Sequence, residues 1–157
     1  QGIWPTNGYF QNKIMSYFAS EGEKLEKVNT SKGAVYEDAL FIQLRELSGA
    51  FKGGKDWKGQ IIPKLWYQRK IHQPLRPLSG EIKRKKTKWK DKDVTQFDVT
   101  FGSFKRTFIV ETAWPRRILE WTTSNGEKFT LQKTARLPYW GLHNPGDEKF
   151  LKQIGLD

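Results

Sequence analysis

The second half of the chain alternates between apolar and polar residues, which is the pattern of strands with one buried face. The alternating segments are separated by turn residues at spacings of about 8 to 12 residues. They are residues 61–71, 81–89, 94–101, 104–112, 117–122 and 128–134. This spacing predicts an antiparallel meander of about six strands, twisted strongly enough to be half-barrel-like.

The last of the expected hairpins has the clearest turn signal. A three-residue loop over 124–126 places Gly126 at a position that needs a positive φ. It also sets Trp121 opposite Phe129, apolar against apolar. A two-residue turn would set Trp121 opposite Thr130 instead, so the faces favour the longer loop.

Helices are predicted at both ends of the chain. Apolar residues recur near helical spacing over 7–20, where Asn7 can cap the start and Gly22 can end the helix. Residues 144–155 begin with Asn, Pro and two acids and end with Gly, which predicts a short helix. We expect its apolar stripe to close one end of the sheet.

Residues 35–47 fit either a helix or a strand, because periodicity cannot decide for so short an apolar run. No internal repeat or linker interrupts the chain. We therefore expect one α+β domain over residues 1–157. It consists of a strongly twisted antiparallel β-meander with an N-terminal amphipathic helix and a short C-terminal helix.

Apolar and aromatic side chains are expected to line one face of the meander. They are Phe97, Val99, Phe101, Phe104, Phe108, Val110, Leu119, Trp121, Phe129 and Leu131. A curled sheet with such a face either fills itself with side chains or encloses a cavity for one apolar ligand. The sequence leaves both outcomes open.

Charge is concentrated in the middle of the chain. The net charge is +11, and residues 64–93 hold eleven Lys and Arg against three acids, or +8 of that total. Such a chain has one electropositive face or arm, and its field attracts anions over about 8 to 10 Å in physiological salt.

The core of this basic segment is residues 81–93. Read as a strand, it carries cations on both faces, so we expect it to project or to run along a sheet edge. Lysines at an edge can simply block pairing with another chain. Alternatively, they form a contact surface for phosphate, sulfate or anionic lipid. A turn at Asp91 and Lys92, or one that also includes Asp93, would place different faces over the core.

A second cluster of candidate residues precedes the C-terminal helix, over residues 136–143. Tyr139 and Trp140 are expected either to plug the open end of the sheet or to form the wall of a binding site. In the second case Arg136 and His143 would be polar handles.

Catalytic signals are sparse. The absence of cysteine excludes disulfides, Cys-ligated zinc and thiol nucleophiles. The two histidines, His72 and His143, have no metal-binding spacing, and no phosphate-binding loop or nucleophile elbow occurs. Glu111 and Glu120 flank a corner that contains two arginines, and a charge pair with Arg116 or Arg117 explains them better than catalysis. We expect no cofactor, and the sequence favours a binding protein over an enzyme.

The expected function is a non-enzymatic binding domain with a basic rim for an anionic or amphipathic ligand, lipid-like or glycan. The expected ligand-binding residues are Lys83, Arg84, Lys85, Lys86, Lys88, Trp89, Arg136, Tyr139, Trp140 and His143. The alternative is a nucleic-acid or acidic-protein binding module that uses the basic hairpin over 83–92, with Trp66, Tyr67 and Trp89 as stacking platforms.

The first residue is Gln1 rather than Met, and no apolar run of about 18 residues occurs. We expect an extracytoplasmic protein, periplasmic or secreted, after removal of a signal; a cytoplasmic protein is the alternative.

Overall fold

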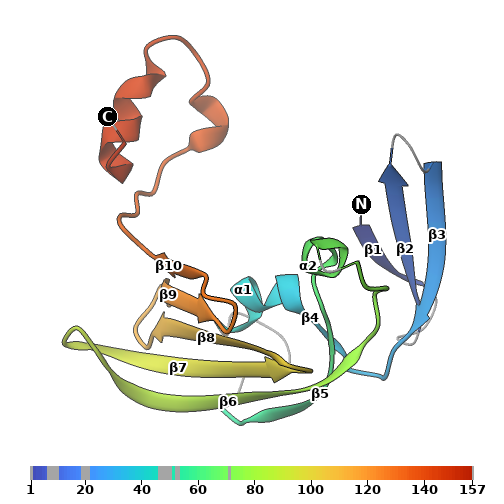
Figure 1. Cartoon of the computed structure of the whole chain (residues 1–157). Coiled ribbons are helices and arrows are strands. Elements are labelled where there is room, and N and C mark those ends of the chain that lie inside the picture. The colour runs from blue at the N-terminus through green and yellow to red at the C-terminus, as the bar shows by residue number, and fades with distance from the viewer. Residues whose placement is uncertain are drawn as a thin grey trace.

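The strands of this protein form two separate sheets, one of three strands and one of seven (Figure 1). The computed structural model describes residues 2–6, 11–18, 22–45, 51, 54–70 and 72–156. The fold is rich in β structure and has a few short helices, which agrees with the predicted α+β class in broad terms.

The seven-stranded sheet is open and mixed. Its order is β10-β9-β8-β7-β6-β5-β4, and every neighbouring pair is antiparallel except β4 and β5. The bounds are β4 (Val35–Tyr36), β5 (Trp57–Ile62), β6 (Leu78–Trp89), β7 (Lys92–Phe101), β8 (Phe104–Glu111), β9 (Ile118–Thr123) and β10 (Lys128–Thr130). The meander from β5 to β10 follows the chain order, and β4 adds a parallel edge that the sequence did not predict.

Four of the six predicted strand segments are strands over nearly their whole length. The segment 128–134 is a strand only over Lys128–Thr130, and the segment 61–71 is wrong beyond Ile62. Strand β5 ends there, and helix α2 (Leu65–Lys70) follows. Pro63 cannot donate a backbone hydrogen bond to a sheet, which favours the end of the strand. The Lys64 N–H donates to the Glu37 carboxylate over 2.9 Å, a contact between residues far apart in sequence that no local pattern reveals.

The predicted three-residue hairpin loop is confirmed. Trp121 lies opposite Phe129, and their rings stack with centroids 4.0 Å apart. Gly126 has the expected positive φ, 88°.

The turn between β6 and β7 follows neither predicted alternative. It consists of Lys90 and Asp91, whose φ angles are 45° and 63°, and it sets Trp89 opposite Lys92. Two successive positive φ values give a turn whose twist matches that of the flanking strands.

The N-terminal helix predicted over 7–20 is not found. Gln11–Phe18 is strand β2, which pairs antiparallel with β1 (Gly2–Thr6) and with β3 (Gly22–Asn29). A short apolar run suits a helix or a strand, and here pairing on both sides accompanies the strand. The proposed cap, Asn7, lies outside the described residues.

The ambiguous segment 35–47 is mostly helical as far as it is described. After β4 come the 3-10 helix η1 (Glu37–Ala39) and helix α1 (Leu40–Gln43). Leu40 and Leu44 are fully buried in one cluster with sheet residues such as Phe97 and Phe108. Helix α1 therefore covers this face of the sheet.

The apolar face of the sheet is close to the predicted one. The buried cluster contains Phe97, Val99, Phe101, Phe104, Phe108 and Val110, with Trp121 packed against it. Leu119 is the exception, because an irregularity in the β8–β9 pairing sets Val110 opposite Ile118 and turns Leu119 to the other face. Phe129 is exposed.

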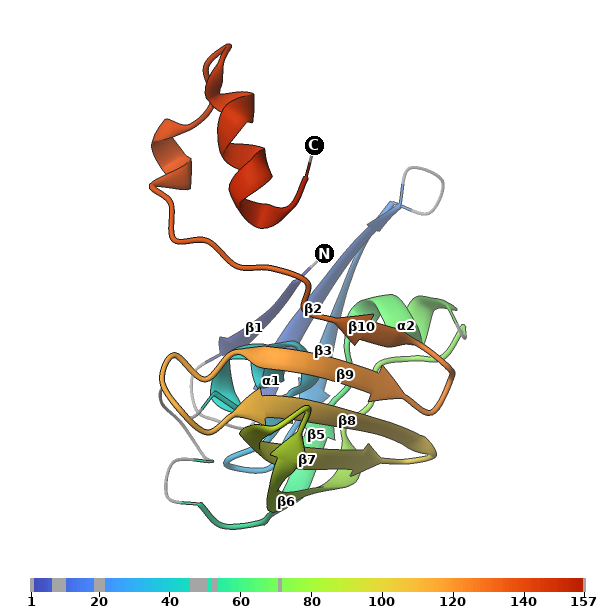
Figure 2. The same cartoon turned by 90° about the vertical axis from the view of Figure 1, so that its left-hand side faces the viewer.

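The C-terminal helix forms as a 3-10 helix, η3 (Asp147–Ile154), after the single turn η2 (Tyr139–Gly141). It does not close the sheet as expected. None of its residues is buried, and Figures 1 and 2 show the C-terminal segment, in red, standing away from the sheet.

Candidate basic cavity

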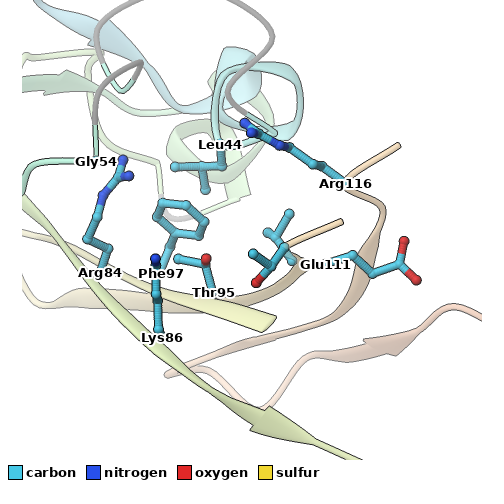
Figure 3. A pocket seen from close by; sticks show the side chains of 10 residues that line it. Leu44, Gly54, Arg84, Lys86, Thr95, Phe97, Glu111 and Arg116 are labelled. Carbon is cyan, nitrogen blue, oxygen red and sulfur yellow. The ribbon is translucent and has the colours of Figure 1, made fainter. Parts of the chain in front are cut away.

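A cavity of about 400 Å³ lies between the projecting halves of β6 and β7, the end of β8 and the residues that follow α1. It has an apolar floor and a polar rim (Figure 3). The residues that line it are Leu44, Gly54, Arg84, Lys86, Thr95, Phe97, Val110, Glu111, Thr112 and Arg116.

Strand β6 supplies two of the cations because its register turns alternate residues toward this side. Residues Leu78–Ile82 of β6 lie between β5 and β7, whereas β7 is the only described strand that pairs with Lys83–Trp89. This basic half of β6, Lys83–Trp89, therefore projects along an edge of the sheet, as predicted. Arg84 and Lys86 share a face with buried Ile82, and they lie opposite Phe97 and Thr95.

Arg84 is held in place by several contacts. Its guanidinium carbon lies 5.1 Å from the centroid of the Phe97 ring, and its Nη2 donates to the Phe51 carbonyl oxygen over 3.0 Å. Its backbone N–H donates to Asp56 Oδ1 over 2.9 Å. These contacts orient the side chain before any ligand arrives.

Arg116 reaches the cavity from the loop between β8 and β9. Its φ is 56°, and its carbonyl oxygen accepts a hydrogen bond from Arg45 Nε over 3.0 Å. Arg45 Nη2 also donates to the Pro115 carbonyl oxygen over 2.9 Å. The loop is thereby tied to the residues that follow α1, and Figure 3 shows Arg84, Lys86 and Arg116 arranged around Phe97 and Leu44.

Glu111 is the only carboxylate among the described lining residues, and its charge is compensated. Arg117 Nη2 lies 2.6 Å from Glu111 Oε1 and Arg117 Nε 2.7 Å from Oε2, which confirms the predicted charge pair for Glu111. Glu120 is paired instead with Lys128, at 3.3 Å. The hydrogen bonds from Arg117 hold the pKa of Glu111 below its usual value, although burial opposes them. In Figure 3 the Glu111 carboxylate points away from the other side chains. The described wall of the cavity is therefore electropositive.

The other predicted cations do not join Arg84 and Lys86. Lys83 and Lys85 lie on the opposite face of β6, and Lys83 Nζ is 3.3 Å from the Glu81 carboxylate. Lys88 is paired with Asp93 at 2.8 Å. The basic rim expected from the sequence is thus divided between two faces and partly neutralised.

Trp89 is also on the opposite face. It packs against Val94, Ile109 and Leu119, and Lys90 Nζ lies 4.5 Å from the centroid of its ring. Its ring therefore contributes to a small second core.

The predicted C-terminal candidates are separate from the cavity. Arg136 lines a different, open groove together with Phe41, Ile118 and Leu131. Tyr139 and Trp140 are 77% and 73% exposed, so they do not plug the sheet. His143 is exposed as well.

Sequence reasoning missed most of the cavity, because it assigned to a binding site only Arg84 and Lys86 of the described lining residues. The lining residues that it did not assign to a site are Leu44, Gly54, Thr95, Phe97, Val110, Glu111, Thr112 and Arg116. Thr95 could have been found from the alternation, once the turn of the β6–β7 hairpin was known. Arg116 had no such signal, since a contact between residues 45 and 116 positions it.

No cluster of three or more His, Cys, Asp or Glu side chains that could hold a metal ion occurs in the described part of the chain. Within the same residues, no helix is long and apolar enough to cross a membrane.

Neither the sequence nor the fold matches a known protein in three comparisons, with protein-family models, with curated proteins and with solved structures.

Proposed function

We propose that this domain is a non-enzymatic binding protein whose cavity takes a small amphipathic anion, a phosphate or similar headgroup attached to a short apolar chain. One observation carries the proposal: three cationic side chains from two separate segments surround an apolar floor. A volume of about 400 Å³ lies within the range of small-molecule sites, roughly 300 to 1,000 Å³.

The chemistry of the lining suits the two parts of such a ligand. The guanidinium groups of Arg84 and Arg116 are planar forks that match phosphate or carboxylate oxygens, and Lys86 adds a point charge. The hydroxyl groups of Thr95 and Thr112 can donate further hydrogen bonds. The apolar chain would lie on Phe97, Leu44 and Val110 and be removed from water there.

A nucleic-acid interface has less support. Such a surface needs aromatic rings that bases can stack on beside the cations. Trp89 packs into the small second core, and Trp66, although 58% exposed, lies on α2 and not on the basic hairpin. The cations of β6 are divided between two faces. The cavity therefore favours a compact anion over an extended polyanion.

Charge reversal at Lys86 tests the proposal, with Lys85 as the matched control. The two lysines are neighbours on β6, carry the same charge and point to opposite faces. We expect Lys86→Glu to weaken binding of octyl phosphate by about tenfold or more, since about 1.4 kcal/mol corresponds to a factor of ten. Lys85→Glu should change it less than about threefold, the size of a screened surface effect. Titration calorimetry at one fixed salt concentration measures both.

Equal losses in the two variants would mean that the net charge of the hairpin, and not the cavity, attracts the anion. Inorganic phosphate and octyl glucoside separate the contributions of headgroup and chain. We expect each to bind more weakly than octyl phosphate, because each meets only part of the lining.

A further inference from the structure

The segment over residues 131–156, called here the C-terminal arm, makes little use of its apolar side chains within the fold. None of its residues is buried. Its first residues still contact the sheet, since the Leu131 N–H donates to the Leu119 carbonyl oxygen over 2.8 Å and Arg117 Nη1 donates to the Thr134 hydroxyl over 3.1 Å. Figures 1 and 2 show the rest of the arm turning back on itself away from the seven-stranded sheet. Hydrogen bonds nevertheless join parts of the arm to one another. Lys133 Nζ donates to the carbonyl oxygen of Lys152, and the Leu156 N–H donates to the carbonyl oxygen of Leu151.

The arm exposes large apolar groups at two places. Tyr139 and Trp140 are 77% and 73% exposed, and their rings meet edge to face with centroids 5.4 Å apart. Leu151 on η3 and Leu156 just after it are 43% and 54% exposed. Trp and Tyr have an apolar body and a polar edge, which suits the boundary between water and lipid.

The charges of the arm favour an anionic partner. Its cations are Lys133, Arg136, Lys149 and Lys152, and its acids are Asp147 and Glu148, which gives a net charge of +2. Both acids are engaged within the arm: Asp147 accepts the Asn144 N–H over 2.9 Å, and Glu148 accepts the Gly146 N–H over 2.7 Å. Because hydrogen bonds from the backbone leave a carboxylate charged, the field that a partner meets is that of the net charge of +2.

We propose that the C-terminal arm docks this protein on the surface of an anionic lipid bilayer. The aromatic pair and the leucines would enter the headgroup boundary, and the cations would lie against anionic headgroups. A second copy of the chain is a poorer partner, because each copy carries a net charge of +11 and the two would repel each other. This inference does not depend on the cavity and its ligand.

Vesicle co-sedimentation tests the proposal. The full chain is mixed with vesicles of phosphatidylcholine alone, or of phosphatidylcholine with an equal amount of phosphatidylglycerol. We expect about tenfold stronger binding to the anionic vesicles, and a fall as salt is raised. The double variant Tyr139→Ser, Trp140→Ser should lose about tenfold of that binding, because it removes the exposed aromatic pair that would enter the headgroup boundary.

Trp114→Ser is the matched control. Trp114 is about as exposed as Tyr139 and Trp140, at 76%, but it lies on the loop before β9 and not in the arm. We expect this variant to bind the anionic vesicles like the wild type. Circular dichroism confirms that all variants are folded, and octyl phosphate titration of the same variants reports on the cavity separately.

Three results would overturn the proposal. One is equal binding to neutral and anionic vesicles, and another is unchanged binding of the double variant. The third is a dimer in light scattering that the double variant abolishes, with no binding to vesicles, which would assign the arm to a second copy.

Discussion

Replacing Arg106 with Met is expected to lower the free energy of unfolding by about 3–5 kcal/mol, the usual result of breaking a buried ion pair from one side. Arg106 is 1% exposed, and its Nη1 lies 2.9 Å from Oε1 of Glu37, which is equally buried. Without Arg106, the Glu37 carboxylate would stay in the core without its buried ion-pair partner. Urea unfolding measures the loss.

The surroundings of this pair explain the size of the effect. Four aromatic rings lie within 6 Å of the Arg106 guanidinium carbon, and they belong to Phe41, Phe104, Phe108 and Trp121. Burial raises the pKa of Glu37 above its usual value, against the opposing hydrogen bond from Lys64 and the charge of Arg106. Glu37 thus joins η1, the start of α2 and β8 in one contact network.

A double variant separates the ion pair from simple loss of packing. Glu37→Gln combined with Arg106→Met removes both charges and keeps an acceptor oxygen for the Lys64 N–H. We expect this protein to be more stable than Arg106→Met alone, because no uncompensated charge is left in the core. If Arg106→Met unfolds at the same urea concentration as the wild type, the pair does not stabilise the fold.

Phe108→Ala is expected to cost a similar amount, about 3–5 kcal/mol, as other truncations of buried aromatic residues do. Phe108 is fully buried on β8, and its ring meets that of Phe41 on α1 edge to face, with centroids 5.3 Å apart. Its removal would leave a cavity between the sheet and the helix. Thermal and urea unfolding both measure the change.

Phe129→Ala is the control for this truncation. Phe129 stacks on Trp121 but is 55% exposed at the edge strand β10. We expect it to cost about 1 kcal/mol or less, the value of a surface cross-strand pair. Equal costs for the two variants would contradict the assignment of the core to the face that α1 covers.

The strands from β6 to β10 could be predicted because their information is local. Alternation along each segment marks a buried face, and the turn residues mark the ends. The register of the last hairpin followed from the same rule, since only one loop length paired Trp121 with Phe129. The core-facing position of Arg106 was also within reach, because it lies between Phe104 and Phe108 on the same face.

The missed features depend on residues far apart in the chain. Strand β4 pairs with β5 across about 26 residues of sequence, by the register Val35 to Ile61, and no local pattern signals a parallel partner. The start of α2 is bonded to Glu37, and the Arg116 loop is bonded to Arg45.

The basic segment shows the same limit at the candidate site. Its charge was evident from composition alone, and its position at an edge followed from cations on both faces. Which cations share a cavity depends on the side of the sheet that α1 covers and on the loop that brings Arg116 to it. Both are tertiary contacts, so the sequence could predict an electropositive arm but not the binding residues.

A crystal structure of the protein with octyl phosphate tests the central proposal most directly. We expect the phosphate group to lie among Arg84, Lys86 and Arg116, with the octyl chain on Phe97 and Leu44. Octyl phosphate bound on the opposite face of β6, beside Lys83 and Lys85, would contradict the proposal, as would an empty cavity at saturating ligand.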